Sequence, residues 1–470
     1  MITYTDKTGR LIYQDAQLND SPDGHVITRY VYDDYDRLAW IVTPKGSDLL
    51  NASSNYRLSD DFTKQNCYVF LYDGFGRIVE KHIAGREPEY LVYDMGDRLV
   101  MSQDGNMRTS NQWMTYEYDG LGRLFRQYLA TDSSTDDQKE RHEEFQANFI
   151  EGNLPLLYVE AQTLIRQYDY DDYDMLQDSD LAFRNISDMT DEGTVSMLNR
   201  NVKGWLTAEK LAVLDHYSCA ETYYHRAYYY DDKGRVIQLV QKSADGGILR
   251  VTNKYDFTGN LIAQRESHES GDTTNNLYRY FVFDSRGRLT KETAQFNDGE
   301  QAVVAYTYDD LGQLTGKTYG TGAHAIHETM DYNIQGWLTR KNSELFHMEL
   351  RYFDAYREVL KPSYTGNIVN WQWSHKQING NTYGDDCEYG FHYDDLSRLT
   401  DAELFICDPI DANNEYTENG ITYDKNGNII TLNRSSLSSE DTRSYRFSYN
   451  GNQRVKETNS NSLYGYDANG

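Results

Sequence analysis

The sequence lacks the surplus of basic residues that a protein needs to bind nucleic acid or an anionic membrane surface. Its 470 residues include 74 acidic and 46 basic side chains, which gives a net charge of −28, whereas phosphate backbones and anionic lipids both attract basic surfaces. No run of about 18 apolar residues occurs, so we expect no transmembrane helix. Residues 1–25 have neither the basic nor the apolar segment of a signal peptide.

Cysteine and proline are also scarce. The four cysteines, Cys67, Cys219, Cys387 and Cys407, form no CxxC pair, which disfavours a zinc ribbon or a disulfide scaffold and leaves the redox compartment open. Only 6 prolines occur, against 42 tyrosines. Disordered chains are rich in proline and poor in aromatic residues, so we expect a folded protein. Tyrosine suits a pleated surface because its ring is apolar and its hydroxyl needs a partner.

One short motif recurs along the chain in about fifteen copies. It consists of an aromatic residue, Asp or Asn, two or three variable residues, Gly, often Arg, and then an aliphatic residue. Such repetition indicates a repeat architecture. The residues to which we assign a structural role in the clearest copies are Tyr72, Asp73, Gly76, Arg77, Tyr118, Asp119, Gly122, Arg123, Tyr230, Asp231, Gly234, Arg235, Tyr255, Asp256, Gly259, Phe283, Asp284, Gly287, Arg288, Tyr308, Asp309, Gly312, Tyr423, Asp424 and Gly427.

Several copies depart from this pattern. The copies at 32–38, 170–176 and 393–399 lack the glycine. Two further copies, at 201–207 and 333–339, carry tryptophan in the place of the arginine. We expect each of these to be a unit of its own.

Each copy predicts a β-hairpin. Aromatic residues alternate before the turn, as in Tyr116 and Tyr118, which is the period of a strand with one aromatic face. The Asp is expected to cap a tight turn and the Gly to supply a positive φ. The Arg, four residues after the Asp, is expected to fold over the carboxylate as an exposed pair worth about 0–1 kcal/mol.

The predicted organisation is one continuous array over residues 1–470. Length alone would suggest about three domains of roughly 150 residues, but no linker or change of composition divides the chain. Residues 134–150 are predicted to form a helix, with Phe145 and Phe149 one turn apart, inside an insertion at about 131–165. A second irregular region covers about 353–392. The predicted fold class is all-β.

The repeats resemble the RHS/YD-repeat family, whose mark is Tyr-Asp-x-x-Gly-Arg-Leu repeated every 20 to 30 residues, and the resemblance covers about residues 4–467. The stretch 85–100 is also similar to RHS proteins of Bacteroides-like bacteria. The resemblance implies tandem YD-repeat hairpins that form a large spiralling, curved sheet or hollow shell. In bacterial RHS proteins and the C components of insecticidal toxin complexes, the shell encloses a C-terminal toxin. In teneurins, similar repeats form a barrel on an adhesion receptor.

The resemblance further implies a secreted or cell-surface protein that acts in intercellular competition as part of a polymorphic toxin, and members are often associated with carbohydrate binding. The RHS core that closes such shells has no counterpart here, because Asp408-Pro409 lacks a glycine-rich motif around it. The last copy stops at 466–470. We therefore expect a fragment of a longer protein, whose partner is a C-terminal toxin or effector domain absent from this chain.

An aromatic cluster outside the regular copies supplies the candidate glycan-binding residues. It comprises Trp371 and Trp373, with Tyr364 and Tyr383 nearby. Aromatic rings beside Asn and Asp side chains suit the binding of cell-surface glycans. Packing within a sheet explains the same pattern, because Trp371 and Trp373 also fit a period of two.

No catalytic, cofactor or metal site is predicted. The densest acidic cluster, at 169–174, lacks the glycine and the closing glutamate of a calcium loop and coincides with a predicted turn. The glycines at 320–322 lack the third glycine of a nucleotide loop, and no nucleophile motif occurs. The predicted function is a non-enzymatic shell segment, and the alternative is a carbohydrate-binding or adhesion module. A glycosidase would need paired carboxylates, and no spacing selects a pair.

Overall fold

The chain forms a single sheet of thirty strands. The computed structural model describes residues 1–18, 24–52, 59–134, 136–151, 159–177, 179–185, 198–213, 222–353, 360–375, 387–407, 416–435, 443–457 and 463–470. In the first half of the sheet the strands are β1 (Ile2–Thr5), β2 (Leu11–Gln17), β3 (His25–Tyr32), β4 (Leu38–Val42), β5 (Cys67–Tyr72), β6 (Ile78–His82), β7 (Glu89–Tyr93), β8 (Leu99–Gln103), β9 (Gln112–Tyr118), β10 (Leu124–Asp132), β11 (Val159–Asp171), β12 (Val202–Ala212), β13 (Tyr223–Tyr230), β14 (Val236–Lys242) and β15 (Ile248–Tyr255).

The second half continues in the same manner. Its strands are β16 (Leu261–Ser270), β17 (Thr273–Phe283), β18 (Leu289–Phe296), β19 (Gln301–Tyr308), β20 (Leu314–Tyr319), β21 (Ile326–Tyr332), β22 (Leu338–Ser343), β23 (Phe346–Arg351), β24 (Asn370–His375), β25 (Cys387–Tyr393), β26 (Leu399–Cys407), β27 (Glu418–Tyr423), β28 (Ile429–Arg434), β29 (Arg443–Asn450) and β30 (Gln453–Glu457). Each strand pairs antiparallel with the next one in sequence, as β9 does with β10 and β10 with β11.

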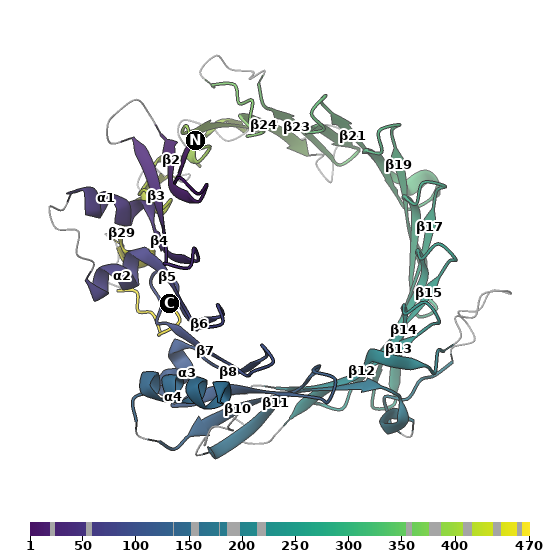
Figure 1. Ribbon diagram of the computed structural model, residues 1–470. Helices are drawn as coiled ribbons and strands as arrows, with labels where there is room; N and C mark the ends of the chain where they lie inside the picture. The colour runs from purple at the N-terminus through teal and green to yellow at the C-terminus, as the bar shows by residue number, and fades with distance from the viewer. Residues whose placement is uncertain are drawn as a thin grey trace.

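The sheet curves around an open centre until its two ends overlap (Figure 1). Strands β2 to β24 follow one another around the ring, and β29 lies beside the early strands β3 to β5. The solvent-accessible area is 27928 Å² for 54.6 kDa, whereas a compact monomer of that mass would expose about 18,000 Å². A single-layer sheet accounts for the difference because both of its faces reach solvent. The predicted all-β fold of tandem hairpins is therefore confirmed.

In the part of the chain that the structure describes, the helices lie on the outside of the ring (Figure 1). They are α1 (Pro44–Ala52), α2 (Asp60–Asn66), α3 (Gly105–Thr109) and α4 (Gln138–Ile150), with short 3-10 turns at Asp174–Leu176 and Gly322–His324. The helix predicted within 134–150 is α4. Asp137 caps it by accepting the backbone N–H groups of Lys139 and Glu140. Its Phe145 is fully buried against Trp113, at a ring separation of 5.3 Å.

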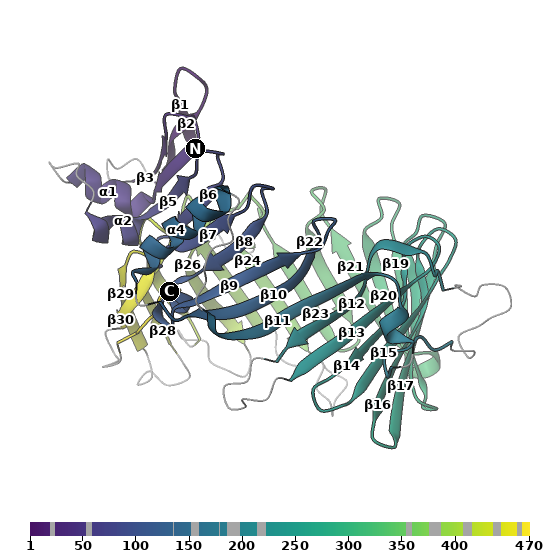
Figure 2. The same cartoon turned by 60° about the horizontal axis from the view of Figure 1, so that its bottom comes forward.

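The ring has two rims, one at each end of its strands (Figure 2). One, which we call the turn rim, holds the segments that join an odd-numbered strand to the next even-numbered strand, and the turns of the repeated motif, such as 119–123, lie there. The other, the connection rim, holds the segments that lead on to the next odd-numbered strand, including α1, α2, α3 and α4. This separation follows from antiparallel order, because alternate connections must lie at opposite ends of the strands.

The ring closes where the turn rim of the last hairpins meets the connection rim of the first ones. We call this contact the seam. The Lys45 backbone N–H at α1 donates to Asn426 Oδ1 at 2.9 Å, and Lys425 pairs with Asp48 at 2.8 Å. The last hairpin continues this contact, because Gln453 Nε2 donates to the Gly85 carbonyl at 2.6 Å.

The end of the described chain completes the seam. The Glu87 backbone N–H donates to the Ala468 carbonyl at 3.0 Å. Asn106 Nδ2 donates to Asp467 Oδ2 at 2.9 Å. Packing here is close, because a Cβ on Gly105 would lie 2.7 Å from the Ala468 carbonyl oxygen, and one on Gly451 would overlap the Gln65 carbonyl oxygen. The seam is thus a shaped contact between residues more than 350 positions apart in sequence.

One prediction about the repeats is wrong. The segments 170–176 and 201–207 are two halves of one hairpin and not two copies, because Tyr170 pairs with Leu206 across β11 and β12. Asp171 Oδ1 accepts the Gly204 backbone N–H at 2.6 Å, the contact that closes the turn in spite of the insertion between them. In this hairpin an insertion separates Asp171 from Gly204. The sequence therefore shows two incomplete motifs where the structure has one unit.

Candidate functional site

Each regular turn is fixed by its own Asp and Gly. In the turn at 119–123, Asp119 Oδ1 accepts the backbone N–H groups of Leu121 and Arg123, both at 2.9 Å. Gly122 has a φ of +80°, which costs a residue with a Cβ about 1–2 kcal/mol. The hydrogen bond from the Arg123 backbone N–H lowers the pKa of the Asp119 carboxyl. Burial by itself would raise that pKa, but its effect is smaller. In this turn the Asp side chain thus bonds to the backbone, and the Gly occupies the position of positive φ.

The arginine of the motif connects neighbouring hairpins. Arg288 Nε donates to Asp284 Oδ2 of its own turn at 2.7 Å, and Nη1 donates to the carbonyl of Asp309 in the next turn at 3.1 Å. Its guanidinium also lies 4.8 Å from the centre of the Tyr308 ring. The expectation of an exposed pair is wrong for this turn, because the Arg288 and Asp284 side chains are only 26% and 22% exposed, although Arg98 in another turn is 43% exposed.

The tyrosine of the motif bonds back to the preceding hairpin. The Tyr308 hydroxyl donates to the Leu289 carbonyl at 2.8 Å, and the Tyr423 hydroxyl donates to the Leu399 carbonyl at 2.6 Å. Burial raises the pKa of Tyr423. These hydroxyl groups therefore link each of the two hairpins to the one before it.

In two turns a tryptophan stands in the place of the motif arginine, and its ring still contacts the tyrosine of the next hairpin. The Trp205 ring lies 5.1 Å from the Tyr230 ring, and the Trp337 ring lies 5.0 Å from the Tyr352 ring. A Cβ on Gly234 would lie 3.2 Å from the Trp205 ring. The glycine of the next turn thus gives the larger ring its space.

The aromatic face of the sheet lines the inside of the ring. Helix α4 packs on the outside, in a cluster with Val92 and Trp113 (Figure 1). Tyr93 follows Val92 on the same strand and therefore points to the opposite face, toward the open centre. The strand pairing carries this face around the sheet: Trp113 of β9 lies in the same outer cluster, so Tyr116 and Tyr118 of that strand also point inward. We call this inner surface the lumen wall.

Charged side chains on the lumen wall form cross-strand ion pairs. Arg226 pairs with Glu209 at 3.1 Å, and Lys341 pairs with Glu328 at 2.9 Å. The Tyr228 hydroxyl also donates to Glu209, at 2.7 Å, and burial raises the pKa of Tyr228 to about 12. Within each of these pairs the two charges cancel.

A row of stacked rings crosses the lumen wall from β24 to β25. The ring centres of Trp371 and Trp373 are 4.3 Å apart, those of Trp373 and Tyr389 are 5.7 Å apart, and those of Tyr389 and Phe391 are 6.0 Å apart. Trp371 pairs with Leu350 of β23 and Tyr389 of β25, so all of these residues share the face of the turn tyrosines. We call Trp371, Trp373, Tyr389 and Phe391 the lumenal aromatic patch.

A cavity of about 390 Å³ opens beside this patch. Its apolar walls come from Trp371, Tyr389, Phe391, Leu399, Ala402 and Tyr416, and Glu418, Arg434 and Ser435 complete it. Glu418 accepts Arg434 Nε at 2.7 Å. Such a volume and lining are typical of a small ligand site.

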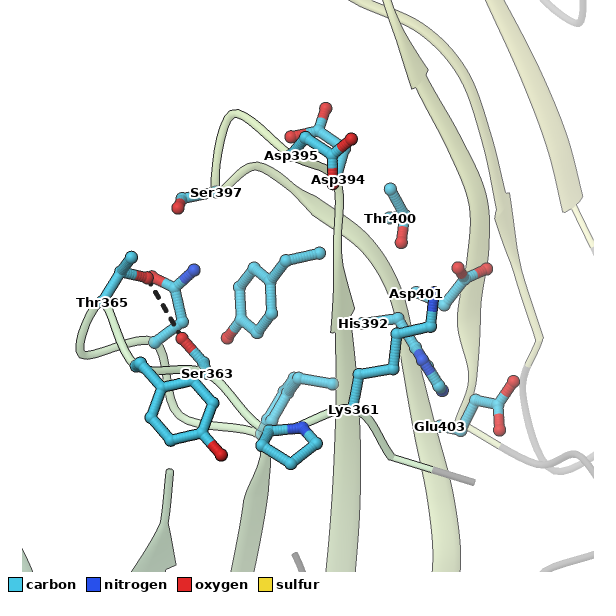
Figure 3. Close-up of a pocket in the computed structure, with 15 residues that line it drawn as sticks. Lys361, Ser363, Thr365, His392, Asp394, Asp395, Ser397, Thr400, Asp401 and Glu403 are labelled. Carbon is cyan, nitrogen blue, oxygen red and sulfur yellow. Dashed lines mark hydrogen bonds between the residues drawn. The ribbon is translucent and has the colours of Figure 1, made fainter. Parts of the chain in front are cut away.

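A second cavity, of about 640 Å³, lies at the turn rim beside β25 and β26 and has a polar lining (Figure 3). Lys361 reaches toward Asp401, and His392 and Glu403 lie beside them. His392 pairs with Asp401 in register, on the face opposite to Phe391. Tyr364 stacks at 6.1 Å on Phe353 at the edge of this cavity, and its side chain is 78% exposed.

The candidate glycan-binding residues do not form one cluster. Trp371 and Trp373 lie on the regular strand β24, not outside the repeats, because the irregular region returns to the sheet at Asn370. Tyr364 lines the polar cavity at the turn rim, and Tyr383 lies outside the described residues. The sequence placed these residues together because they are close in number, whereas the insertion between β23 and β24 carries Tyr364 away from the wall.

Within the described residues, no group of three or more His, Cys, Asp or Glu side chains could hold a metal ion. The same residues contain no helix with the length and apolar character needed to cross a membrane. Cys67 is a free, fully buried thiol, and Cys387 on β25 is disulfide-bonded. The spacing of the cysteines in the sequence predicts neither the free thiol nor the disulfide.

Comparison with known proteins gives structural likeness only. No protein-family model and no curated protein matches the chain. The Photorhabdus luminescens Tc holotoxin pore with the TccC3-D651A mutation is 12% identical over 97% of this chain and 23% of that chain, at a TM-score of 0.49. The TcdB2-TccC3 structure is 13% identical over 98% of this chain and 24% of that chain, also at 0.49. The chain thus spans about a quarter of the length of these toxin proteins.

Proposed function

We propose that this chain is a non-enzymatic wall segment of an RHS/YD-type shell that encloses a polypeptide. The observation that carries the proposal is the closed ring, in which a shaped seam joins the first and last hairpins around an open centre (Figure 1). From the resemblance of the repeats, we further propose that the natural cargo is a C-terminal toxin or effector domain used in intercellular competition.

The lumen wall supports a polypeptide as the cargo. Its rings supply apolar contacts, and ion pairs such as Arg226 with Glu209 leave little net charge to repel either sign. A nucleic acid would require a basic wall. The acidic surplus outside the ion pairs favours solubility and discourages association between shells.

A permanently unfolded polypeptide tests enclosure. Reduced, carboxymethylated α-lactalbumin would be mixed with the chain and followed by co-elution in gel filtration and by its rate of digestion by trypsin. We expect co-elution and slower digestion, because the wall surrounds the bound chain. Digestion at the free rate without co-elution contradicts enclosure. A variant with an opened seam, Gly451→Ala, is the control for the closed ring and is expected to protect less.

For location, we propose a secreted or cell-surface protein. The disulfide at Cys387 supports this proposal, because disulfides persist in oxidising compartments. Fractionation of the native producing cells, with detection of the chain outside the cytoplasm, tests it. Recovery of the chain in the cytoplasm alone, with Cys387 reduced, contradicts it.

Carbohydrate binding is the second candidate function. The polar cavity at the turn rim favours it, because the exposed Tyr364 ring lines the same cavity as Asp401, Glu403 and Lys361, whose side chains can bond to hydroxyl groups. A glycan array with the chain and its Tyr364→Ala variant tests this site. Binding that disappears in the variant supports the candidate, and equal binding by both proteins excludes Tyr364 from it.

A further inference from the structure

We infer that the lumenal aromatic patch and its adjoining cavity form a binding site for one large apolar side chain of an extended polypeptide inside the ring. The inference rests on the proposed function, since it names where the enclosed chain is held. It depends on four features of the site: its position, its size, an unpaired donor, and the way the rings are stacked.

The position makes the site accessible only from the open centre. Trp371 and Tyr389 share the face of the turn tyrosines, which is opposite to the face that α4 covers. A ligand outside the ring therefore meets the other side of β24 and β25. A polypeptide inside the ring passes directly over the patch.

The size fits a side chain and not a folded domain. The cavity of about 390 Å³ is bounded by Leu399, Ala402 and Phe391 on its apolar side. Pockets of about 300–1,000 Å³ accept small ligands. An aromatic or branched aliphatic side chain with its own backbone matches that range and can exchange its hydration for apolar contact.

An unpaired donor points to a backbone carbonyl as the polar partner. Trp371 Nε1 is buried and has no acceptor among the described residues. An unmade bond of this kind costs about 1–3 kcal/mol. The neighbouring polar groups are already used, because Glu418 accepts from Arg434 and the Tyr416 carbonyl accepts from the Tyr389 hydroxyl at 2.5 Å. A polypeptide supplies an acceptor at every residue, whatever its sequence.

The stacking of the rings disfavours a sugar at this site. A sugar binds through its C–H groups to a free ring face, whereas each of the four rings of the patch already has another ring stacked on it, with ring centres 4.3–6.0 Å apart. The further contacts that stacked aromatic rings make suit aromatic and aliphatic side chains. The site therefore favours a polypeptide over a glycan.

A photo-crosslinking peptide tests the site directly. The probe is a Gly/Ser peptide with one p-benzoylphenylalanine at its centre, which is irradiated with the whole chain and located by mass spectrometry. We expect crosslinks on β24, β25 and β26. Trp371→Ala is expected to lower the yield about five- to tenfold. Trp371→Phe, which keeps the ring and removes the N–H donor, is expected to give an intermediate yield and guards against misfolding of the smaller variant.

Two matched variants complete the design. Phe281→Ala removes another aromatic residue of the lumen wall, and Tyr364→Ala removes the exposed ring at the turn rim. Both are expected to leave the crosslink yield unchanged. Equal crosslinking in Trp371→Ala, crosslinks centred on Tyr364, or competition by maltohexaose would overturn the inference.

The proposed function can be judged separately. If the wild-type chain protects carboxymethylated α-lactalbumin and Trp371→Ala protects it equally, enclosure stands and this binding site is wrong. If the wild-type chain gives no protection while the peptide still crosslinks at the patch, the site stands and enclosure is wrong.

Discussion

Replacing Gly105 with alanine is expected to open the seam without unfolding the sheet. Gly105 is the first residue of α3 and is buried. A Cβ there would lie 2.7 Å from the Ala468 carbonyl oxygen and 2.8 Å from both the Ala468 and the Glu87 Cβ atoms. The φ of Gly105 is not positive, so alanine introduces a clash and no backbone strain. One of the two packed backbones must therefore move.

The free energy by which the seam is stabilised can be estimated from the hydrogen bonds that this contact aligns. They are Glu87 N–H to the Ala468 carbonyl at 3.0 Å, Ala468 N–H to Asn106 Oδ1 at 3.1 Å, Asn469 Nδ2 to Asp104 Oδ2 at 3.0 Å, and Asn106 Nδ2 to Asp467 Oδ2 at 2.9 Å. At about 0.5–1.5 kcal/mol each, these four bonds stabilise the seam by about 2–6 kcal/mol. An opening free energy of about 2 kcal/mol already slows amide exchange about thirtyfold.

Hydrogen exchange with mass spectrometry measures this directly. In the wild-type chain, we expect the amides of Glu87 and Ala468 to be protected, and in Gly105→Ala we expect that protection to fall by about thirtyfold or more while β9 and β10 keep theirs. Gly120→Ala is the matched control, because no atom lies within 4 Å of a Cβ there and its φ is not positive either. Alanine stabilises a helix by about 0.5–1 kcal/mol over glycine. Unchanged or increased protection in Gly105→Ala would therefore refute the shaped seam.

Three other predictions concern the turns and the wall. Gly122→Ala should lower stability by about 1–2 kcal/mol through its positive φ, measured by the urea midpoint, and Gly120→Ala in the same turn should not; equal midpoints would contradict this. The Cys67 thiol, whose pKa burial raises to about 12, should resist Ellman's reagent at pH 8 until the chain is unfolded, and fast labelling of the folded chain would contradict its burial. The pKa of Asp119 is lowered in the fold, so the ionised turn stabilises the chain above the unfolded pKa of about 4 and that stability is lost as pH falls further; melting temperatures that stay constant from pH 5 to pH 2 would contradict this sign.

The turn chemistry and the strand faces could be read from the sequence. Asp119 and Gly122 act within one turn of five residues, and their roles depend on the local backbone only. The alternation of Tyr116 and Tyr118 fixes which side chains share a face, because the side-chain period of a strand is two. The all-β fold and the helix α4 follow from the same local rules.

The tertiary structure decided the contacts between distant residues. The partner of Tyr170 is Leu206 and not Leu176, because an insertion interrupts the turn and only the pairing of β11 with β12 shows which segment returns. The arginine of the motif is half-buried because the next hairpin lies over it, which one copy of the motif cannot reveal. Trp371 lies on the lumen wall and Tyr364 does not, because the insertion between β23 and β24 separates Tyr364 from the strand that carries Trp371.

The sequence by itself determined the repeating unit, and the tertiary structure decided how the units close. A hairpin needs a capping Asp, a residue that tolerates positive φ, and alternating faces, and all of these lie within a few positions of one another. The seam requires that Gly105 meet Ala468, which depends on the curvature accumulated over every strand between them. Small twists between neighbouring strands add up over the sheet, and no single repeat contains their sum.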